Sequence, residues 1–222
     1  MRRKTVTWSI VALILLVVIG AAVTWFVPVF RVGSIEITGA TRTDPTEVEE
    51  VSGIAEGSNL LRMDATAAAT SIAALPWVES VTVNRRLPST VQIDLVEREA
   101  AVFVRRGDGD HVIDTSGRAI IIGTPPPGSI EVRGAREDDP DVLPAVTAVL
   151  AAIDAQDPQL RTLIADIQAP DQFDISLHLT DGREIYWGSS DNNHDKAVAL
   201  ATVVKREGGS WNISSPSMVT VR

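Results

Sequence analysis

The first 30 residues contain the longest apolar pattern of the chain. No charged residue occurs from Thr5 to Phe30, and residues 8–27 read WSIVALILLVVIGAAVTWFV. Twenty residues of helix rise about 30 Å, which is the thickness of the hydrocarbon layer of a bilayer. The pattern therefore predicts a transmembrane helix over residues 8–27. Aromatic rings favour the membrane interface, and the residues that we expect to anchor this helix are Trp8, Leu16, Trp25 and Phe26.

A basic cluster precedes this apolar stretch. Arg2, Arg3 and Lys4 predict that residues 1–7 are a cytoplasmic tail and that the bulk of the chain lies outside, as in a single-pass type II membrane protein. A cleaved signal peptide, with Gly20-Ala21-Ala22 as its small-residue site, is the alternative. A signal core has about 7–15 apolar residues, so the longer run here favours an uncleaved anchor.

Residues 30–98 alternate between strand and helix patterns. Residues 34–38 read as a half-buried strand, and Asp44-Pro45 is a typical helix start. A second helix starts at Asp64, with apolar residues at helical spacing at Ala68, Ile72 and Leu75. Two alternating strands, over residues 81–84 and 91–95, then form a hairpin. The order predicts a β-α-α-β-β domain with two helices on one face of a three-stranded sheet. We expect Trp77 to pack between the second helix and this sheet.

Residues 99–222 are richer in strands and predict a second domain. The segments that we expect to be extended include a hairpin over 111–122, a strand over 164–167, and a second hairpin that begins with the alternation of Phe173, Ile175, Leu177 and Leu179. Two helices are expected: one buries Val146, Val149, Leu150 and Ile153, and the other buries Ala197, Leu200, Ala201 and Val204. Gly208-Gly209 ends the second helix, and a terminal strand follows. The fold class is therefore α+β.

Composition and charge exclude several classes of function. The net charge is -9, and from Phe30 onward 17 basic residues stand against 29 acidic ones, which argues against binding to nucleic acid. The absence of cysteine excludes disulfides, thiolate metal sites and a cysteine nucleophile.

The polar motifs give no catalytic, metal or cofactor site. Ser189-Ser190 precedes a helix start, and Asp108-Gly109-Asp110-His111 fails the register of a calcium loop and predicts a solvated turn. His178 is expected on an exposed strand face, and His194 in the first turn of a helix. The sequence therefore favours a protein that is not an enzyme and uses no cofactor.

Three strings of the sequence carry a resemblance to a known family. They are VGSIEITGA, EGSNLLRMD and ALPWVESVTVNRRLPSTVQIDLVER, and the first of them begins two residues after the apolar stretch. The chain resembles the FtsQ family of bacterial cell-division proteins, called DivIB in some bacteria, which has a single membrane span, a POTRA domain and a C-terminal β domain. The later string VIDTSGRA is similar to a hairpin of that family. The resemblance implies a POTRA domain over 30–98 and a mixed, strand-rich β domain with two helices over 99–222.

The resemblance also implies partners and a location. It implies a scaffold at the division septum that binds small single-span coiled-coil proteins, FtsB (or DivIC) and FtsL, and that connects them to an FtsW-type glycosyltransferase and a septal transpeptidase. The family places its partner-binding edge after the last helix, which here indicates Ser214, Ser215, Pro216, Ser217, Met218, Val219, Thr220 and Val221. Proline within a sheet is confined to edges and bulges, so Pro216 also favours an edge.

The sequence leaves two alternatives open, one for the role of Arg85 and Arg86 and one for the function of the protein. Arg85 and Arg86 could form a recruitment surface, or they could be a charged hairpin tip that keeps a turn in water. The alternative function is a membrane-anchored extracytoplasmic cell-wall hydrolase, which needs a clustered nucleophile or metal site that the sequence does not show.

Overall fold

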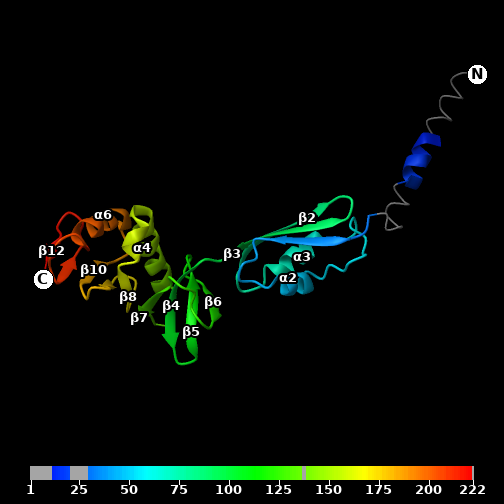
Figure 1. Cartoon of the computed structure of the whole chain (residues 1–222). Coiled ribbons are helices and arrows are strands. Elements are labelled where there is room, and N and C mark those ends of the chain that lie inside the picture. The colour runs from blue at the N-terminus through cyan, green and yellow to red at the C-terminus, as the bar shows by residue number, and fades with distance from the viewer. Residues whose placement is uncertain (1–11, 21–29, 137–138, 222) are drawn as a thin grey trace, which may run out of the picture. The chain divides into compact units, whose positions relative to one another are not determined.

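The computed structural model describes residues 12–20, 30–136 and 139–221. The chain divides into two compact units, with the boundary between Glu97 and Arg98 (Figure 1). Residues 12–20 are helical. Within the described ranges, no helix combines the length and the apolar character that crossing a bilayer requires.

The first unit is a three-stranded sheet with two helices. Its elements are β1 (Ser34–Thr38), α2 (Pro45–Ser52), α3 (Ala65–Ile72), β2 (Val78–Arg86) and β3 (Thr90–Glu97). The strand order is β1-β3-β2, with β1 parallel and β2 antiparallel to β3. The predicted β-α-α-β-β order is thus confirmed. Its buried core consists of Val32, Val48, Leu60, Ile72, Val78, Val91, Ile93 and Leu95.

The helices of the first unit begin where their capping residues predict. Asp44 accepts the N–H of Thr46 at 2.8 Å, and Asp64 accepts those of Thr66 and Ala67 at 3.0 Å each. Gly53 ends α2 in the left-handed region at φ 65°. The second helix is shorter than the sequence suggests, because α3 ends at Ile72, so that Leu75 lies beyond it.

Trp77 differs from the prediction. It is half-buried and does not belong to the core of the first unit. The guanidinium carbon of Arg42 lies 5.0 Å from the centroid of its ring, in a cation–π arrangement. The expectation that Trp77 is packed between helix and sheet was therefore wrong: one side of its ring faces an arginine instead of the core.

The second unit is built on one nine-stranded sheet. Its strands are β4 (Ala100–Arg106), β5 (Gly109–Asp114), β6 (Ala119–Ile122), β7 (Ile130–Arg133), β8 (Ile164–Gln168), β9 (Ile175–Leu179), β10 (Glu184–Gly188), β11 (Ser210–Asn212) and β12 (Thr220–Val221). Their order is β12-β11-β10-β9-β8-β7-β4-β5-β6, so β12 and β6 are the two edges. The helices are α4 (Val142–Gln156), α5 (Pro158–Arg161) and α6 (Asn193–Val203). Figure 1 shows α4 and α6 side by side.

The core of the second unit lies between these helices and the sheet. It includes Val146, Val149, Leu150 and Ile153 of α4, as predicted, and Trp187 of β10 is fully buried. The observed α+β class, with a POTRA-like order followed by a strand-rich unit, agrees with the sequence.

Several elements of the second unit differ from the prediction. Phe173 is exposed and lies before the start of β9. The chain turns at this point, because the side chain of Asp171 accepts the N–H of Phe173 at 2.8 Å. On α6 the predicted Ala197 and Leu200 are buried, together with Lys196 and Val203. Ala201 is only half-buried, as is Val204, which lies just beyond the end of the helix. The short elements β7 and α5 were not predicted.

The boundary between the units lies between two charged side chains. Glu97 accepts the backbone N–H groups of Thr41, Arg42 and Thr43 at 3.0, 3.0 and 2.8 Å, all within the first unit. Arg98 donates to Asp114 at 2.8 Å within the second unit. Glu97 is therefore hydrogen-bonded within the first unit and Arg98 within the second.

Candidate partner-binding site

The candidate site lies at the C-terminal edge of the nine-stranded sheet. Strand β11 pairs in parallel with β10, and β12 pairs antiparallel with β11, with Trp211 opposite Val221. The chain reaches this edge through Gly208, which has a φ of 153°. A Cβ at Gly208 would lie 3.0 Å from Val221 and 3.1 Å from Trp211, so the positive φ and the close side chains together favour glycine here.

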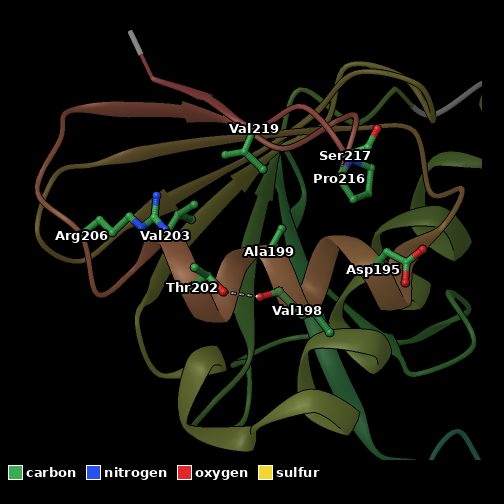
Figure 2. Close-up of a pocket in the computed structure, with 9 residues that line it drawn as sticks. All are labelled: Asp195, Val198, Ala199, Thr202, Val203, Arg206, Pro216, Ser217 and Val219. Carbon is green, nitrogen blue, oxygen red and sulfur yellow. Dashed lines mark hydrogen bonds between the residues drawn. The ribbon is translucent and has the colours of Figure 1, made fainter.

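A groove of about 480 Å³ runs between α6 and the segment before β12 (Figure 2). Its apolar lining includes Val198, Ala199, Val203 and Val219. Asp195 and Arg206 lie at opposite ends of the groove, so that one end is acidic and the other basic (Figure 2). The remaining residues of the lining are Thr202, Pro216 and Ser217.

Helix α6, which forms one wall of this groove, is held at both ends. At its start, Asn193 accepts the indole N–H of the buried Trp187 at 2.9 Å. At its end, the guanidinium of Arg183 donates to the carbonyl oxygens of Val204 and Arg206, at 3.0 Å each. These contacts bind α6 to β10 and its preceding turn, so the wall has a fixed position on the sheet.

A buried lysine holds the loop that precedes α6. Lys196 is only 2% exposed, and its Nζ donates to the carbonyl oxygen of Ser189 at 2.8 Å. Burial lowers the pKa of Lys196, and the nearby charge of Asp191 opposes this shift. This role of Lys196 was not predicted, because the sequence places the residue on a helix without any sign of a buried acceptor.

The predicted strand over residues 214–221 is only partly present. Thr220 and Val221 form β12, at the sheet edge, but Ser214 to Met218 form bends and a turn. Ser214 donates from its backbone and side chain to Asn212, at 3.0 and 2.8 Å, and this local bonding ends the strand. The expectation of one continuous terminal strand was therefore wrong.

The side chains of this terminal segment differ in burial. Val219 packs against the core of the second unit, whereas Met218 is 70% and Val221 is 55% exposed. A substitution at Val219 would thus disturb the core as well as the edge. The exposed pair Met218 and Val221 gives a cleaner test of the edge.

The other predicted residues belong to β2 and to the N-terminal segment. Arg85 and Arg86 are exposed at the end of β2, and Arg85 donates to the carbonyl oxygen of Met63 at 2.6 Å. Leu16 is exposed in the helical segment 12–20. Trp8, Trp25 and Phe26 lie outside the described residues.

The candidate polar residues Ser189, His178 and His111 have local partners. Ser189 donates its hydroxyl to Asp191 at 3.0 Å, and a ring nitrogen of His178 lies 2.7 Å from a carboxylate oxygen of Asp166. His111 lies 2.8 Å from Asp108 in the predicted turn. In the part of the chain that the structure describes, no three His, Asp or Glu residues are grouped as a metal site requires.

Comparison with known proteins assigns the chain to a family. Residues 30–98 match the family model "POTRA domain, FtsQ-type", and residues 102–217 match "Cell division protein FtsQ/DivIB, C-terminal". The cell division protein FtsQ of Corynebacterium glutamicum is 64% identical over 222 residues, which is 100% of both chains. FtsQ of Mycolicibacterium smegmatis is 31% identical over 219 residues, covering 99% of this chain and 65% of that protein.

A solved structure gives a weaker likeness. The extracytoplasmic domain of the trans isomer of DivIB from Geobacillus stearothermophilus aligns with 50% of this chain and 97% of its own, at 17% identity and a TM-score of 0.36. The assignment to a family depends on the sequence matches. Since two family models match in succession and a full-length relative is 64% identical, the chain belongs to the FtsQ/DivIB family of bacterial cell division proteins.

Proposed function

We propose that this protein is a non-enzymatic, membrane-anchored scaffold of the division complex. It binds the extracytoplasmic segments of FtsB/DivIC-like and FtsL-like coiled-coil proteins and connects them to the FtsW-type glycosyltransferase and the septal transpeptidase. In this proposal residues 1–7 lie in the cytoplasm, residues 8–27 span the membrane, and both units work outside it at the septum. Family membership and the charge pattern of the first 30 residues support this proposal.

The observation that carries the proposal is the open edge at β12. This strand is the last in the order of the sheet, so one side of its backbone has no neighbouring strand among the described elements. Such an edge can accept an extended segment of another chain through main-chain hydrogen bonds. Met218 and Val221 add exposed apolar surface beside it.

The charges at the two ends of the groove beside α6 favour one orientation of a bound partner. A partner that lies over β12 and along the groove would meet the carboxylate of Asp195 at one end and the guanidinium of Arg206 at the other. Opposite charges at the two ends favour one orientation of a partner with complementary charges. The apolar lining between them suits one face of an amphipathic helix.

The test of the proposal is a co-purification experiment with the full chain in detergent. The double variant Met218→Asp, Val221→Asp should weaken capture of the coiled-coil segments at least about tenfold, because it places charge on an apolar contact surface. Both side chains are exposed, so the fold should persist. The matched control is Ile122→Asp, since Ile122 is also 55% exposed but lies on β6 at the opposite edge. Normal capture by the double variant, with loss in the control, would assign binding to the β6 edge.

The anchor is tested separately from the partner site. Leu16→Arg places an ionised residue near the centre of residues 8–27, at a cost of about 2.5–3.5 kcal/mol on insertion scales. We expect a smaller share of this variant in the membrane fraction than of the unchanged chain. A mature protein that begins near Val23 would support the cleaved signal peptide instead.

A further inference from the structure

Three segments of the first unit meet where the chain enters it, and we call them the basic pole: residues 30–33, 57–63 and 85–90. The N–H of Leu60 donates to the carbonyl oxygen of Phe30 at 2.9 Å, and the N–H of Val32 donates to that of Ser58 at 2.9 Å. The N–H of Gly33 donates to the carbonyl oxygen of Ser89 at 2.7 Å. These bonds hold the entering chain, the loop before α3 and the β2–β3 turn together.

The basic pole has a charge opposite to that of the rest of the protein. It contains four arginines, all exposed, and no acidic residue. The rest of the chain from residue 30 onward carries 13 basic and 29 acidic residues. In the sequence, Glu56 and Asp64 border the pole, and Asp64 is already bonded to the start of α3. The charge of Arg86 also reaches the carboxylate of Asp94 on β3, which accepts hydrogen bonds from Thr38 and Gln92 at 2.7 Å each. The four arginines are Arg31, Arg62, Arg85 and Arg86.

An apolar side chain projects from this basic surface. Leu87 follows Arg86 at the turn between β2 and β3 and is 61% exposed. Arg85 donates to the carbonyl oxygen of Met63 at 2.6 Å, which fixes the turn against the loop before α3. A fixed apolar tip among arginines is typical of surfaces that rest on a lipid interface, where the apolar group enters and the basic groups stay at the headgroups.

The length of the chain places this pole close to the membrane. The predicted span ends at Val27, and Phe30 is three residues further on. Three extended residues reach at most about 11 Å, because each adds roughly 3.3–3.6 Å. This step depends on the membrane span of the proposed function, and given that span the pole can contact the lipid surface without a change in the fold.

We propose that the basic pole docks on anionic phospholipid headgroups of the membrane that anchors the chain, with Leu87 entering the interface. The charge of the pole complements such headgroups, whereas the acidic remainder of the protein is repelled by them. A basic residue near an anionic membrane surface contributes about 1 kcal/mol, which is roughly fivefold in partitioning per arginine. Docking orients the first unit on the membrane, a role separate from the partner site at β12.

The absence of cysteine allows a direct test in the full chain. Leu87→Cys carries an environment-sensitive fluorophore, and Ser80→Cys, exposed near the other end of β2, carries the same label as a control. The two positions are seven residues apart, or about 23 Å along the strand. Both proteins are reconstituted in vesicles of phosphatidylcholine, with and without phosphatidylglycerol.

The label at position 87 should give blue-shifted, stronger emission only in the vesicles that contain phosphatidylglycerol, and salt should reverse the shift. Arg85→Gln with Arg86→Gln should abolish it, and the charge-matched control Arg118→Gln with Lys205→Gln should not. Equal emission at position 87 in both kinds of vesicle, in a chain that floats with them, overturns the docking and leaves the span intact.

A second arm makes the test independent of the anchor. The chain that begins at residue 30 contains every residue of both cores. It should co-sediment with vesicles that contain phosphatidylglycerol and not with phosphatidylcholine alone, and Arg85→Gln with Arg86→Gln should lower its partition coefficient about 25-fold. A failure of the full chain to float overturns the span, whereas equal sedimentation with both lipids overturns the docking.

Discussion

Trp187 and Trp77 are both associated with a strand, but they differ in burial and in partners. Trp187 lies within β10, is fully buried and donates its indole N–H to Asn193 at 2.9 Å. Trp77 directly precedes β2, is half-buried and lies against Arg42. The difference teaches that a tryptophan within an alternating strand takes part in the core, whereas one at the start of a strand can be left at the surface.

The largest effect is expected in the second unit. Trp187→Ala removes a fully buried aromatic ring and leaves a cavity, so we expect the free energy of unfolding to fall by about 3–5 kcal/mol. Denaturant unfolding measures the loss, and hydrogen exchange in peptides of β9 and β10 locates it. A loss below about 1 kcal/mol would show that the ring does not support the core.

The next effect concerns Asp114, which is 3% exposed. Its carboxylate accepts from the backbone N–H groups of Ser116 and Arg118 and pairs with Arg98 at 2.8 Å. Asp114→Ala leaves these donors unpaired, and we expect a loss of roughly 3 kcal/mol in the stability of the second unit. The control is Asp110→Ala, which removes a more exposed carboxylate on the same strand and should cost about 0–1 kcal/mol.

Trp77→Ala should have a smaller effect. We expect about 1–2 kcal/mol, from a partial loss of packing and of the cation–π contact with Arg42. Trp77→Phe retains a ring under the guanidinium and should recover most of this loss. A cost as large as that of Trp187→Ala would remove the difference between the two tryptophans.

The smallest effect is a change in the pH dependence of the first unit. Partial burial works to raise the pKa of Glu97, but the N–H groups of Thr43, Thr41 and Arg42 outweigh it and lower the pKa below the ordinary 4.5. The unfolded chain therefore binds more protons, so this contribution is complete above the ordinary pKa and is lost as the pH falls through the lower folded value. Glu97→Gln should flatten the acid limb of the stability curve below about pH 5. An unchanged slope would show that Glu97 contributes nothing through its charge.

The parts of the fold that depend on neighbours in sequence were predictable. Asp44, Asp64 and Gly53 bond within one turn of their own helices, so sequence alone locates the starts of α2 and α3 and the end of α2. The buried face of α4 follows from helical spacing for the same reason. The predicted edge position of the C-terminal strand also agrees with the sheet order.

The parts that depend on distant partners were not predictable. Strand β7 has four residues and is held by parallel pairing with β4 and β8, which lie far from it in sequence. Lys196 is buried on α6, and its Nζ donates to the carbonyl of Ser189 in the loop before the helix, a partner that helical spacing does not indicate. The groove at α6 joins residues 195–206 to residues 216–219, and no local pattern indicates that these segments meet.

The boundary at Glu97 and Arg98 has a consequence for proteolysis. Proteases cut domain linkers that are exposed and free of hydrogen bonds. Here β3 ends at Glu97 and β4 begins at Ala100, and the carbonyl oxygen of Glu99 accepts the N–H of Thr115 at 3.1 Å. A cut between the units requires that one of them release its terminal strand, so limited digestion should leave residues 97–100 intact while exposed turns elsewhere are nicked.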